Sequence, residues 1–560
     1  MTVATVCRTV VPARPAGHGD DTQRRARAVA AGAWLRALLG ACLLMLVLAA
    51  LGGCASLPTG VQRQPSRAIP GSVETALGRI AADSSPDEAL SGFRLLPTGA
   101  FALDTRLALV QHAQRSLDLQ YYLIQDDGIG RTLLRALRDA ALRGVRVRLL
   151  IDDLYTSGSD PLLLGLAAHP NVELRLFNPF PAGRQGFVTR FLASARDFER
   201  VNRRMHNKLL VADGVMAVTG GRNIADEYFM RHALANFVDL DTFVIGSLVP
   251  QLQQLFDDYW NSPVVFPLHA IVPAPLTAEE HRAWFERYTG PDNTPPLEPP
   301  PSTDVLGYGP LREDLEAGRL GLVWAEATAY ADPPARDKGS GASYALVPLE
   351  DVESVRYSVL DMIRGARHEV MITSPYLIPG ERGMAMFREM RAKGVAFKVL
   401  TNSLAATDEP LVHLGYRKYR AAMLKLGVEL YELSPLRVKR SSRLRMFAST
   451  QGRLHAKSVV VDRRRVFIGS MNFDPRSEKH NTEMGVFVDS PALAREVLRL
   501  MDLDKLQASF RVVLGAHGMG LRWLAADDDG EVIIDSEPEV DFKTRLWLEL
   551  LAPLAPEELL

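Results

Sequence analysis

The chain has 560 residues, of which 47% are hydrophobic, and its 65 basic side chains nearly balance 66 acidic ones. This length and composition predict a globular protein of two or more domains. Removal of the N-terminal signal described below leaves a net charge of about −5. That charge argues against a nucleic-acid-binding protein that depends on overall positive charge.

The first 53 residues predict a lipoprotein signal peptide. Arginines precede an apolar run from Ala37 to Leu51, and small residues follow it, which is the order of a secretory signal. The run has 15 residues, fewer than the roughly 20 that span a bilayer, so a transmembrane anchor is disfavoured. The stretch from Leu51 to Cys54, Leu-Gly-Gly-Cys, resembles the lipobox of bacterial lipoproteins. The resemblance implies that Cys54 is acylated and becomes the first residue of the mature protein.

Cysteine usage agrees with this interpretation. Cys7 and Cys42 lie in the signal, so the mature chain keeps Cys54 alone and can form neither an internal disulfide nor a thiolate metal site. Ala55 follows Cys54, and a residue other than Asp at this place implies delivery to the outer membrane of a Gram-negative cell. We therefore expect a periplasm-facing lipoprotein anchored in the membrane of the cell envelope.

The next segments predict a tether and then an α/β unit. Residues 54–90 are rich in Pro, Ser, Gly and Ala, which is typical of a flexible tether. Strands are predicted from Leu117 to Ile124 and from Val145 to Ile151, with a helix between Ile129 and Ala141 that Gly144 caps. Strand, helix and strand of this length form a βαβ unit, with parallel strands and a right-handed crossover.

Asp152 and Asp153 end the second of these strands. Two adjacent carboxylates could hold a metal ion, but acidic residues commonly cap the helix that follows a strand, and we favour the cap. No His, Cys and carboxylate cluster has ligand spacing, so the sequence predicts neither a metal nor a cofactor.

One pattern occurs twice in the chain. It places a Lys two residues after a His, an Asp five residues after that Lys, and a Gly-(Gly/Ser)-x-Asn turn, all within 18 residues. The first copy contributes His206, Lys208, Asp213, Gly221 and Asn223, and the second His455, Lys457, Asp462, Ser470 and Asn472. If the pattern occurred once, its His could be interpreted as a buried histidine with a structural role. A match of five residue types at a given start has a chance probability on the order of 10⁻⁶, so two copies favour function.

Each copy has the local features of half a phosphate site. The apolar runs after Lys208 and Lys457 predict buried strands, and side chains two apart on a strand share a face, so each His lies beside its Lys. The glycine-containing turn lets an anion approach backbone N–H groups, and the Asn amide can donate beside them. The predicted phosphate-binding residues are Lys208, Lys457, Asn223, Asn472, Gly221 and Ser470.

The second half of the chain repeats the first at an offset near 250 residues. Strand, helix and strand are predicted again at 370–374, 384–392 and 395–400, so an internal duplication of a βαβ-rich lobe explains the repeat. A proline-dense stretch from Pro291 to Pro301 predicts a linker or insertion between the lobes. The expected domains are a signal at 1–53, a tether at 54–90, lobes at 91–288 and 346–503, a linker at 289–345 and a C-terminal extension at 504–560.

The doubled pattern resembles the phospholipase D superfamily, and residues 204–208 and 220–229 are similar to bacterial cardiolipin synthases of the C type. The similarity runs from about Phe93 to the C-terminus and departs from the superfamily at Gly221, where Ser is commoner. It implies an α/β fold of two phospholipase D-like lobes related by a pseudo-twofold axis, with the active site at their interface. It also implies that Asp239 and Glu483 orient the opposing or nearby histidine.

The resemblance further implies a two-step displacement. His206 attacks the phosphorus of a phospholipid to form a covalent phosphatidyl-histidine, and His455 acts as general acid and then as base. The residues alone leave the two histidines interchangeable. The motif lysines supply the positive charge. Asp213 and Asp462 complete the catalytic motifs, but we expect them to support the motif strands rather than touch substrate.

The expected function is a phosphatidyltransferase that makes cardiolipin from membrane phospholipids without a cofactor. If water replaces the acceptor alcohol, the enzyme is a phospholipase D. An exported phosphodiesterase or nuclease is disfavoured by the acidic mature chain and the acyl anchor. A non-catalytic lipid-binding lipoprotein is disfavoured by the two intact motifs. Membrane phospholipids are thus the expected partners, and nucleic acid is not.

Basic residues crowd the approach to each motif. They are Arg190, Arg196, Arg200, Arg203 and Arg204 before the first, and Arg437, Lys439, Arg440, Arg443, Arg445 and Arg453 before the second. Two interpretations are open: solvated charge on long loops, or a positive rim that attracts anionic lipid headgroups.

Overall fold

The structure is a computed structural model. It describes residue 40 and residues 56–194, 197–294, 296–334, 354–439, 450–501, 507–515, 518, 520–527 and 530–551. Apart from Gly40, the predicted signal and its Cys54 lie outside the described residues, as do Arg196, Arg440, Arg443 and Arg445. The fold below is that of residues 57–560, which form one compact unit. We call residues 57–322 the first lobe and the residues from 323 onward the second.

The first lobe is built on a mixed sheet whose central strands are parallel. Its strand order is β1 (Ser91–Leu96), β8 (Asp241–Gly246), β6 (Met216–Gly220), β5 (Lys208–Ala212), β2 (Ser116–Tyr121), β3 (Arg146–Asp152), β4 (Val172–Phe177) and β9 (Val265–Pro267). Strands β2, β3 and β4 run parallel, and the others pair antiparallel. The strand that carries the first motif therefore lies beside the parallel core.

The second lobe repeats this order and extends it. Its sheet runs β10 (Val323–Ala331), β17 (Met484–Asp489), β16 (Arg465–Gly469), β15 (Ser458–Val461), β11 (Glu369–Thr373), β12 (Ala396–Asn402), β13 (Glu429–Leu433), β18 (Ser509–Leu514), β19 (Leu521–Asp527) and β20 (Gly530–Ile534). The first eight strands match those of the first lobe one for one. The predicted duplication of an α/β lobe is thereby confirmed.

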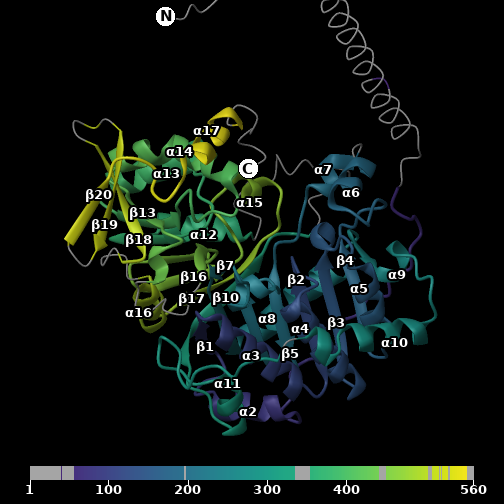
Figure 1. Ribbon diagram of the computed structural model, residues 1–560. Coiled ribbons are helices and arrows are strands. Elements are labelled where there is room, and N and C mark those ends of the chain that lie inside the picture. The colour runs from purple at the N-terminus through teal and green to yellow at the C-terminus, as the bar shows by residue number, and fades with distance from the viewer. Residues whose placement is uncertain are drawn as a thin grey trace, which may run out of the picture. The chain divides into compact units, whose positions relative to one another are not determined.

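Strand β10 joins the two sheets. Residues 323–325 pair with β1, and residues 326–331 pair with β17, so that one 18-stranded sheet runs through both lobes. A second, separate pairing lies between the lobes, where β7 (Ala235–Val238) runs parallel to β14 (Gln451–Leu454). Figure 1 shows the two lobes side by side, with β10 and β7 near their boundary.

Helices flank both sheets. In the first lobe they are α2 (Ala76–Ser84), α3 (Gly99–His112), α4 (Gly128–Leu142), α5 (Asp160–Ala167), α6 (Phe187–Ala193), α7 (Phe198–Val201), α8 (Leu248–Trp260), α9 (Leu268–Ile271), α10 (Ala278–Tyr288) and α11 (Leu311–Glu316). In the second they are α12 (Val355–Arg364), α13 (Gly380–Ala392), α14 (Pro410–Lys425), α15 (Pro475–Lys479), α16 (Pro491–Leu500) and α17 (Phe542–Leu551). Short 3-10 turns are η1 (Asp153–Tyr155), η3 (Asp226–Phe229), η4 (Pro291–Asn293) and η5 (Arg437–Lys439). Within the described residues, no helix combines the length and apolar character needed to cross a bilayer.

Helix α4 shows how the sequence builds these elements. Asp127 caps it by accepting the N–H of Gly130 at 2.9 Å, and the predicted apolar positions from Ile129 to Ala141 are all buried. Gly144 follows the helix at φ 95°, a conformation that favours glycine. Strand β3 then runs parallel to β2, which confirms the βαβ unit.

One of the apolar cores draws on both lobes. It includes Phe256 and Trp260 of α8 from the first lobe and Val460 and Met484 from the second. Two further large cores lie within the first and second lobes, respectively. The lobes thus share a continuous apolar interior around the motif strands, so their relative position is fixed by packing.

The predicted tether at 54–90 is wrong as a description of its ordered part, because this segment is hydrogen-bonded to the first lobe. Arg148 donates to the carbonyl of Ser66 at 3.1 Å, and Gln253 donates to that of Ile69 at 2.9 Å. The Ala68 N–H donates to Asp257 at 2.8 Å, and α2 follows. A composition rich in Pro and Ser disfavours a helix, but it does not show that the segment is flexible. An extended chain still has backbone carbonyls that can accept hydrogen bonds from buried donors.

Parts of the predicted linker and extension also belong to the folded lobes. Residues 311–316 form α11, and Asp314 pairs with the buried Arg94 at 2.5 Å. Beyond residue 504, β18 adds to the second sheet beside β13. Buried Glu432 of β13 accepts from Trp523 at 2.8 Å, so the extension completes a polar contact inside the lobe.

Candidate active site

The two motif histidines lie at the starts of equivalent strands. Lys208 begins β5 opposite Tyr121, the last residue of β2, and Ser458 begins β15 opposite Thr373, the last residue of β11. Both motifs therefore sit at the carboxyl ends of the parallel strands, where open α/β sheets bind ligands. His206 and His455 are 6% and 5% exposed, and both motif lysines are fully buried.

Backbone pairing between the lobes brings the motifs together. The segment before His455 pairs as β14 with β7, which ends one residue before Asp239. The His455 N–H donates to the carbonyl of Val238 at 2.8 Å, and the His206 N–H donates to that of Thr482 at 2.8 Å. Each histidine is thus fixed beside the carboxylate-bearing segment of the opposite lobe, and the predicted common site forms at the interface.

Each histidine contacts the opposing carboxylate. His206 Nδ1 lies 2.8 Å from Glu483 Oε2, and His455 Nδ1 lies 2.6 Å from Asp239 Oδ2. The sequence left open whether the opposing or a nearby carboxylate does this, and the structure selects the opposing one in both cases. With Nδ1–H donating to a carboxylate, Nε2 of each imidazole is left for chemistry.

The lysines are held by their own motifs. Lys457 Nζ donates to the carbonyl of His455 at 2.6 Å, and Lys208 Nζ donates to that of His206. Each ammonium has two further N–H donors, since Lys carries three. The two lysines therefore retain donors for the non-bridging oxygens of one phosphate.

Gly221 and Ser470 occupy the same place in the two motifs but serve the carboxylates differently. A Cβ at Gly221 would lie 2.0 Å from Asp239 Oδ1, so only glycine leaves room for that carboxylate. Ser470 Oγ instead donates to Glu483 Oε2 at 2.5 Å and accepts the Met484 N–H at 3.0 Å. Their predicted phosphate-binding role stays a prediction, and the structure adds a role beside each carboxylate.

The motif asparagines keep unused hydrogen-bonding capacity. Asn223 Nδ2 donates to Tyr228 Oη at 2.9 Å, while its Oδ1 is buried without a partner in the described part of the chain. The Asn472 side chain is 6% exposed, and its Oδ1 likewise has no partner among the described residues. Buried polar atoms without partners are rare and indicate a place for a ligand.

Asp213 and Asp462 do not belong with the catalytic residues. Asp213 accepts the backbone N–H groups of residues 114, 115 and 116 at 2.7–3.1 Å, and Asp462 accepts those of residues 367, 368 and 369 at 2.8–3.0 Å. Each lies after its motif strand, at the end away from the histidine. Their predicted role in supporting the strands agrees with these bonds, whereas a contact with substrate does not.

Asp152 and its counterpart Asn402 were not predicted as site residues. Asp152 accepts the N–H of Met205 at 2.7 Å, and Asn402 Oδ1 accepts the N–H of Leu454 at 2.8 Å. Met205 and Leu454 each precede a motif histidine, so this pair of side chains positions both. Asp152 also caps η1 through Leu154, as the cap interpretation predicts. The matching strand ends could have indicated the pair in the sequence.

Aromatic rings line both histidines, and the sequence analysis missed them. Tyr122 meets the His206 ring edge-on at 4.9 Å, and the Lys208 ammonium lies 5.2 Å from the same Tyr122 ring. Tyr228 meets the His455 ring edge-on at 5.0 Å. These rings hold the imidazoles in place and exclude water from the buried charges.

The four described arginines before the first motif do not form the positive rim that one interpretation allowed. Arg190 and Arg204 are fully buried and donate to backbone carbonyls inside the lobe. Arg200 pairs with Asp197, and Arg203 pairs with Glu199 at 3.1 Å. At the second motif, Arg437 is buried and pairs with Asp527 at 2.7 Å.

No group of three or more His, Cys, Asp or Glu side chains among the described residues could hold a metal ion.

Burial controls the protonation of the motif residues. It lowers the pKa of Lys457 to about 8 and that of Lys208 well below its usual range, against the raising effect of Glu483 and Asp239. Burial and the neighbouring lysines also lower the pKa of both motif histidines, to about 4 for His455. The protein alone stabilises the ammonium ions weakly, so an anionic phosphodiester would stabilise them further.

The carboxyl groups of Asp239 and Glu483 differ in acid strength. Burial opposes ionisation of Asp239, but His455 and Lys457 outweigh it and lower the pKa of Asp239 to about 2. Burial raises the pKa of Glu483 to about 7, although Lys208 and two serine hydroxyls favour its charged form. The imidazolium form is therefore better stabilised at His455 than at His206.

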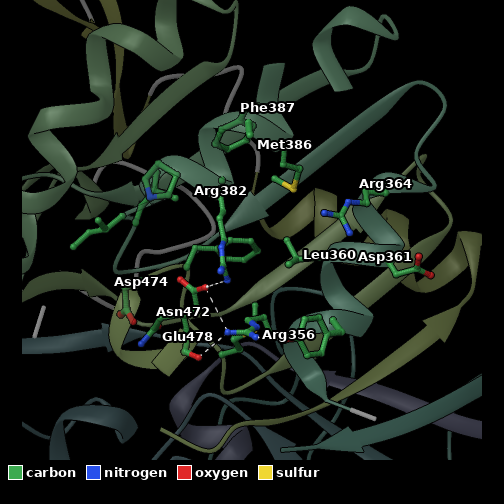
Figure 2. A pocket seen from close by; sticks show the side chains of 18 of the residues that line it. Arg356, Leu360, Asp361, Arg364, Arg382, Met386, Phe387, Asn472, Asp474 and Glu478 are labelled. Carbon is green, nitrogen blue, oxygen red and sulfur yellow. Dashed lines mark hydrogen bonds and ion pairs between the residues drawn. The ribbon is translucent and has the colours of Figure 1, made fainter. Parts of the chain in front are cut away.

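A cavity of about 1090 Å³ adjoins the second motif. Figure 2 shows Asn472 and Asp474 at one end of it, with Leu360, Met386 and Phe387 along the other. Space beside a motif amide is thus available within the second lobe.

The family model described as "Cardiolipin synthase, PLD-like domain" matches residues 107–260 and 359–504, one segment in each lobe. The chain belongs to this family. It is a phospholipase D superfamily enzyme with two copies of the domain, as the doubled motif predicted.

Similar proteins support the assignment. Cardiolipin synthase C of Escherichia coli (strain K12) is 38% identical over 474 residues, which cover 82% of this chain and 94% of that protein. A cardiolipin synthase of Staphylococcus aureus (strain Mu50) is 24% identical over 434 residues, covering 77% of this chain and 70% of that one. The solved structure of phosphatidylserine synthase from Haemophilus influenzae Rd KW20 has a TM-score of 0.53 at 13% identity and covers 86% of this chain and 100% of that chain. That likeness concerns the fold alone.

We predict that Asp213→Ala lowers stability without abolishing catalysis. Loss of the carboxylate leaves three backbone donors without their acceptor, of which the Ser116 N–H is buried, so the free energy of unfolding should fall by about 1–3 kcal/mol. Asp462→Ala should cost less, because Asp462 is partly exposed while Asp213 is 1% exposed. Denaturant unfolding and kcat of the folded protein check this. A folded Asp213→Ala protein as inactive as Lys208→Met would contradict it.

We predict that kcat/KM falls as the pH rises to about 8 and beyond. The lysines act as ammonium ions, and because burial lowers the pKa of Lys457 to about 8 and that of Lys208 also, they lose protons as pH rises through that value. The pH dependence of kcat/KM reports groups of the free enzyme. Rates from pH 6 to 10 on a phosphodiester with a p-nitrophenol leaving group, which needs no general acid, separate the lysines from His455, whose pKa burial lowers to about 4. A flat profile to pH 10 would exclude the assignment.

Proposed function

We propose that this enzyme transfers a phosphatidyl group from one membrane phospholipid to the headgroup hydroxyl of phosphatidylglycerol and so makes cardiolipin. The observation that carries this is the pair of histidines, each held by the opposing lobe's carboxylate beside two buried lysines. Membership of the cardiolipin synthase family and the likeness to cardiolipin synthase C support lipid as the substrate class.

The first step forms a covalent intermediate. Neutral His206 attacks phosphorus through Nε2, a P–N bond forms, and the P–O bond to the leaving alcohol breaks. Burial and the charge of Lys457 lower the pKa of His455. The bound phosphodiester offsets that charge, so His455 carries a second proton and gives it from Nε2 to that alcohol as general acid. Lys208 and Lys457 neutralise the non-bridging oxygens, on which charge develops in the transition state.

The second step returns the enzyme to its starting state. Neutral His455 takes the proton of the incoming hydroxyl, the resulting oxygen attacks phosphorus, and the P–N bond to His206 breaks. The stronger carboxylate supports this division of roles, because ionised Asp239 stabilises the imidazolium of His455 at 2.6 Å. Glu483 is shared with Ser470 and Ser477, which suits a histidine that begins neutral.

The segment outside the described residues completes the proposal. Residues 1–53 act as a lipoprotein signal, and acylated Cys54 anchors the enzyme in the cell envelope, facing the periplasm at the outer membrane. The lipobox-like stretch Leu51 to Cys54 supports this. Lipid analysis of a cardiolipin-deficient bacterium that expresses the chain tests the function: new cardiolipin is expected, and phosphatidic acid alone would indicate hydrolysis instead.

We predict that His206→Asn and His455→Asn each lower kcat/KM on phospholipid by roughly 10³-fold or more, because both steps need both groups. The two variants should differ with a good leaving group such as p-nitrophenol, which needs no general acid. His455→Asn should then accumulate phosphohistidine, while His206→Asn should form none. Mass spectrometry of the quenched enzyme measures this.

A matched control is His269→Asn, an exposed histidine on α9, which should behave as wild type. The opposite trapping pattern would reverse the two roles. Full turnover by either active-site variant would exclude the double displacement.

We predict that Cys54→Ser leaves the precursor unprocessed and without lipid label, while the folded lobes keep their activity on detergent-dispersed phospholipid. An acyl chain contributes about 0.8 kcal/mol per buried methylene, so lipidation should hold the mature form permanently at the membrane. Palmitate labelling and membrane fractionation check this. A processed and labelled Cys54→Ser protein would show that the lipobox interpretation is wrong.

A further inference from the structure

Helix α6 presents its apolar side chains to solvent and buries its arginine. Phe187, Val188 and Leu192 are 48%, 66% and 64% exposed. Arg190 is fully buried and donates to the carbonyls of Leu154 and Arg184 at 3.1 and 3.2 Å. A helix on the surface of a soluble protein normally has the reverse arrangement, so this exposed face suits an apolar environment.

A line of aromatic rings runs from this face to the first histidine. Phe187 stacks on Tyr155 at 6.2 Å, Tyr155 meets Tyr122 edge-on at 5.3 Å, and Tyr122 meets His206 at 4.9 Å. Helices α6 and α7 connect the carboxyl end of β4 to the start of β5. The exposed face is therefore on the same side of the sheet as the active site and continuous with it.

The second lobe has an exposed apolar face on α17. Phe542, Leu546, Trp547 and Leu550 recur at helical spacing and are 51–71% exposed. On the buried side of α17, Leu548 packs against Leu404 and Leu414, which lie after β12 and on α14. Since β12 also ends at the active-site side, α17 lies at the carboxyl ends of the parallel strands of its own lobe.

The two faces lie on one side of the protein. Figure 1 shows α6, α7 and α17 along the same edge, with α15 between them. Arg476 of α15 donates to Asn202, directly after α7, at 3.2 Å, which ties the lobes together there. Because α15 follows the second motif, the apolar faces flank the region of both motifs.

We propose that α6 and α17 together form a membrane-docking surface, defined by Tyr155, Phe187, Val188, Leu192, Phe542, Leu546, Trp547 and Leu550, which inserts into the phospholipid bilayer and brings the active site to its substrates. This rests on the proposed function, in which the phosphodiester must enter the site while its acyl chains stay in the leaflet. A protein seated on both faces would cover the approach to the histidines, so a bilayer is the occupant that the geometry favours.

The arginines beside α6 favour insertion rather than electrostatic attraction. Arg200 and Arg203 of the α7 region are already paired with Asp197 and Glu199. Exposed paired charges contribute little to binding, and they are screened by salt. Vesicle binding should therefore change little between low and high salt.

Leu192→Asp tests the surface, with Leu142→Asp as its matched control. Leu142 is a 58% exposed leucine at the end of α4, on the opposite edge of the sheet. Both changes are made in a chain of residues 55–560, which has neither the acylated cysteine nor the apolar signal, so that neither can mask the effect; residues 57–560 form one compact unit. Flotation with phosphatidylglycerol–phosphatidylethanolamine vesicles should show binding weakened roughly tenfold or more by Leu192→Asp and unchanged by Leu142→Asp.

A second measurement locates the surface directly. An environment-sensitive fluorophore on Leu192→Cys in the same chain of residues 55–560, which has no native cysteine, should shift to the blue and be quenched by spin-labelled lipids. The same label on Leu142→Cys should do neither. An unshielded label at position 192, or equal vesicle binding by the two aspartate variants, would overturn the proposal.

Other outcomes separate this inference from the proposed function. Leu192→Asp should act as wild type on short-chain monomeric phospholipid, and thermal unfolding should show that it is folded. Flotation needs no turnover, so the surface can be upheld even if no cardiolipin forms. If Leu192→Asp abolishes self-association in sedimentation experiments and leaves vesicle binding intact, the apolar faces join copies of the chain and the membrane proposal fails.

Discussion

The contact on which the active site depends is the hydrogen bond from each histidine to the carboxylate of the other lobe. His206 and Glu483, and His455 and Asp239, are separated by more than 200 residues in the chain. Backbone pairing holds both contacts in place, because β7 and β14 join the lobes beside one of them and Met205 bridges to Thr482 beside the other. Neither lobe alone can orient its own histidine, so the duplicated motif becomes a site only when both lobes pack together.

Packing also sets the charge balance of the site. Two lysines, two histidines and two carboxylates are buried at one interface, surrounded by an apolar core to which both lobes contribute. Burying charges costs free energy unless partners compensate. The carboxylates compensate only in part, as the lowered pKa of Lys457 shows. The remaining attraction is available to an anionic phosphodiester, and it is already oriented before the substrate binds.

The duplication is not symmetric where chemistry requires a difference. Gly221 leaves room for Asp239 against the backbone, whereas Ser470 donates to the longer Glu483. Asp239 is shorter and more acidic, whereas Glu483 is longer and shared with Ser470. The two carboxylates therefore stabilise the imidazolium forms of their histidines unequally, although the two motifs are spaced identically. The difference lies in side chains around the motif rather than in the motif itself, and it provides the physical basis for unequal roles.

The sequence alone determined the repeat, the strand that follows each histidine, and the family, because these follow from the spacing and from the apolar runs. It could not decide which carboxylate each histidine meets, since that contact crosses the lobes and depends on how two sheets pack. The same reason explains the misjudged segments. The stretch 54–90 has the composition of a tether but binds donors such as Arg148 that only the folded lobe presents. Arg190 and Arg204 look like surface charge in the sequence, and burial in the fold makes them internal donors. Local pattern fixes local structure, whereas partners distant in the chain are decided by tertiary packing.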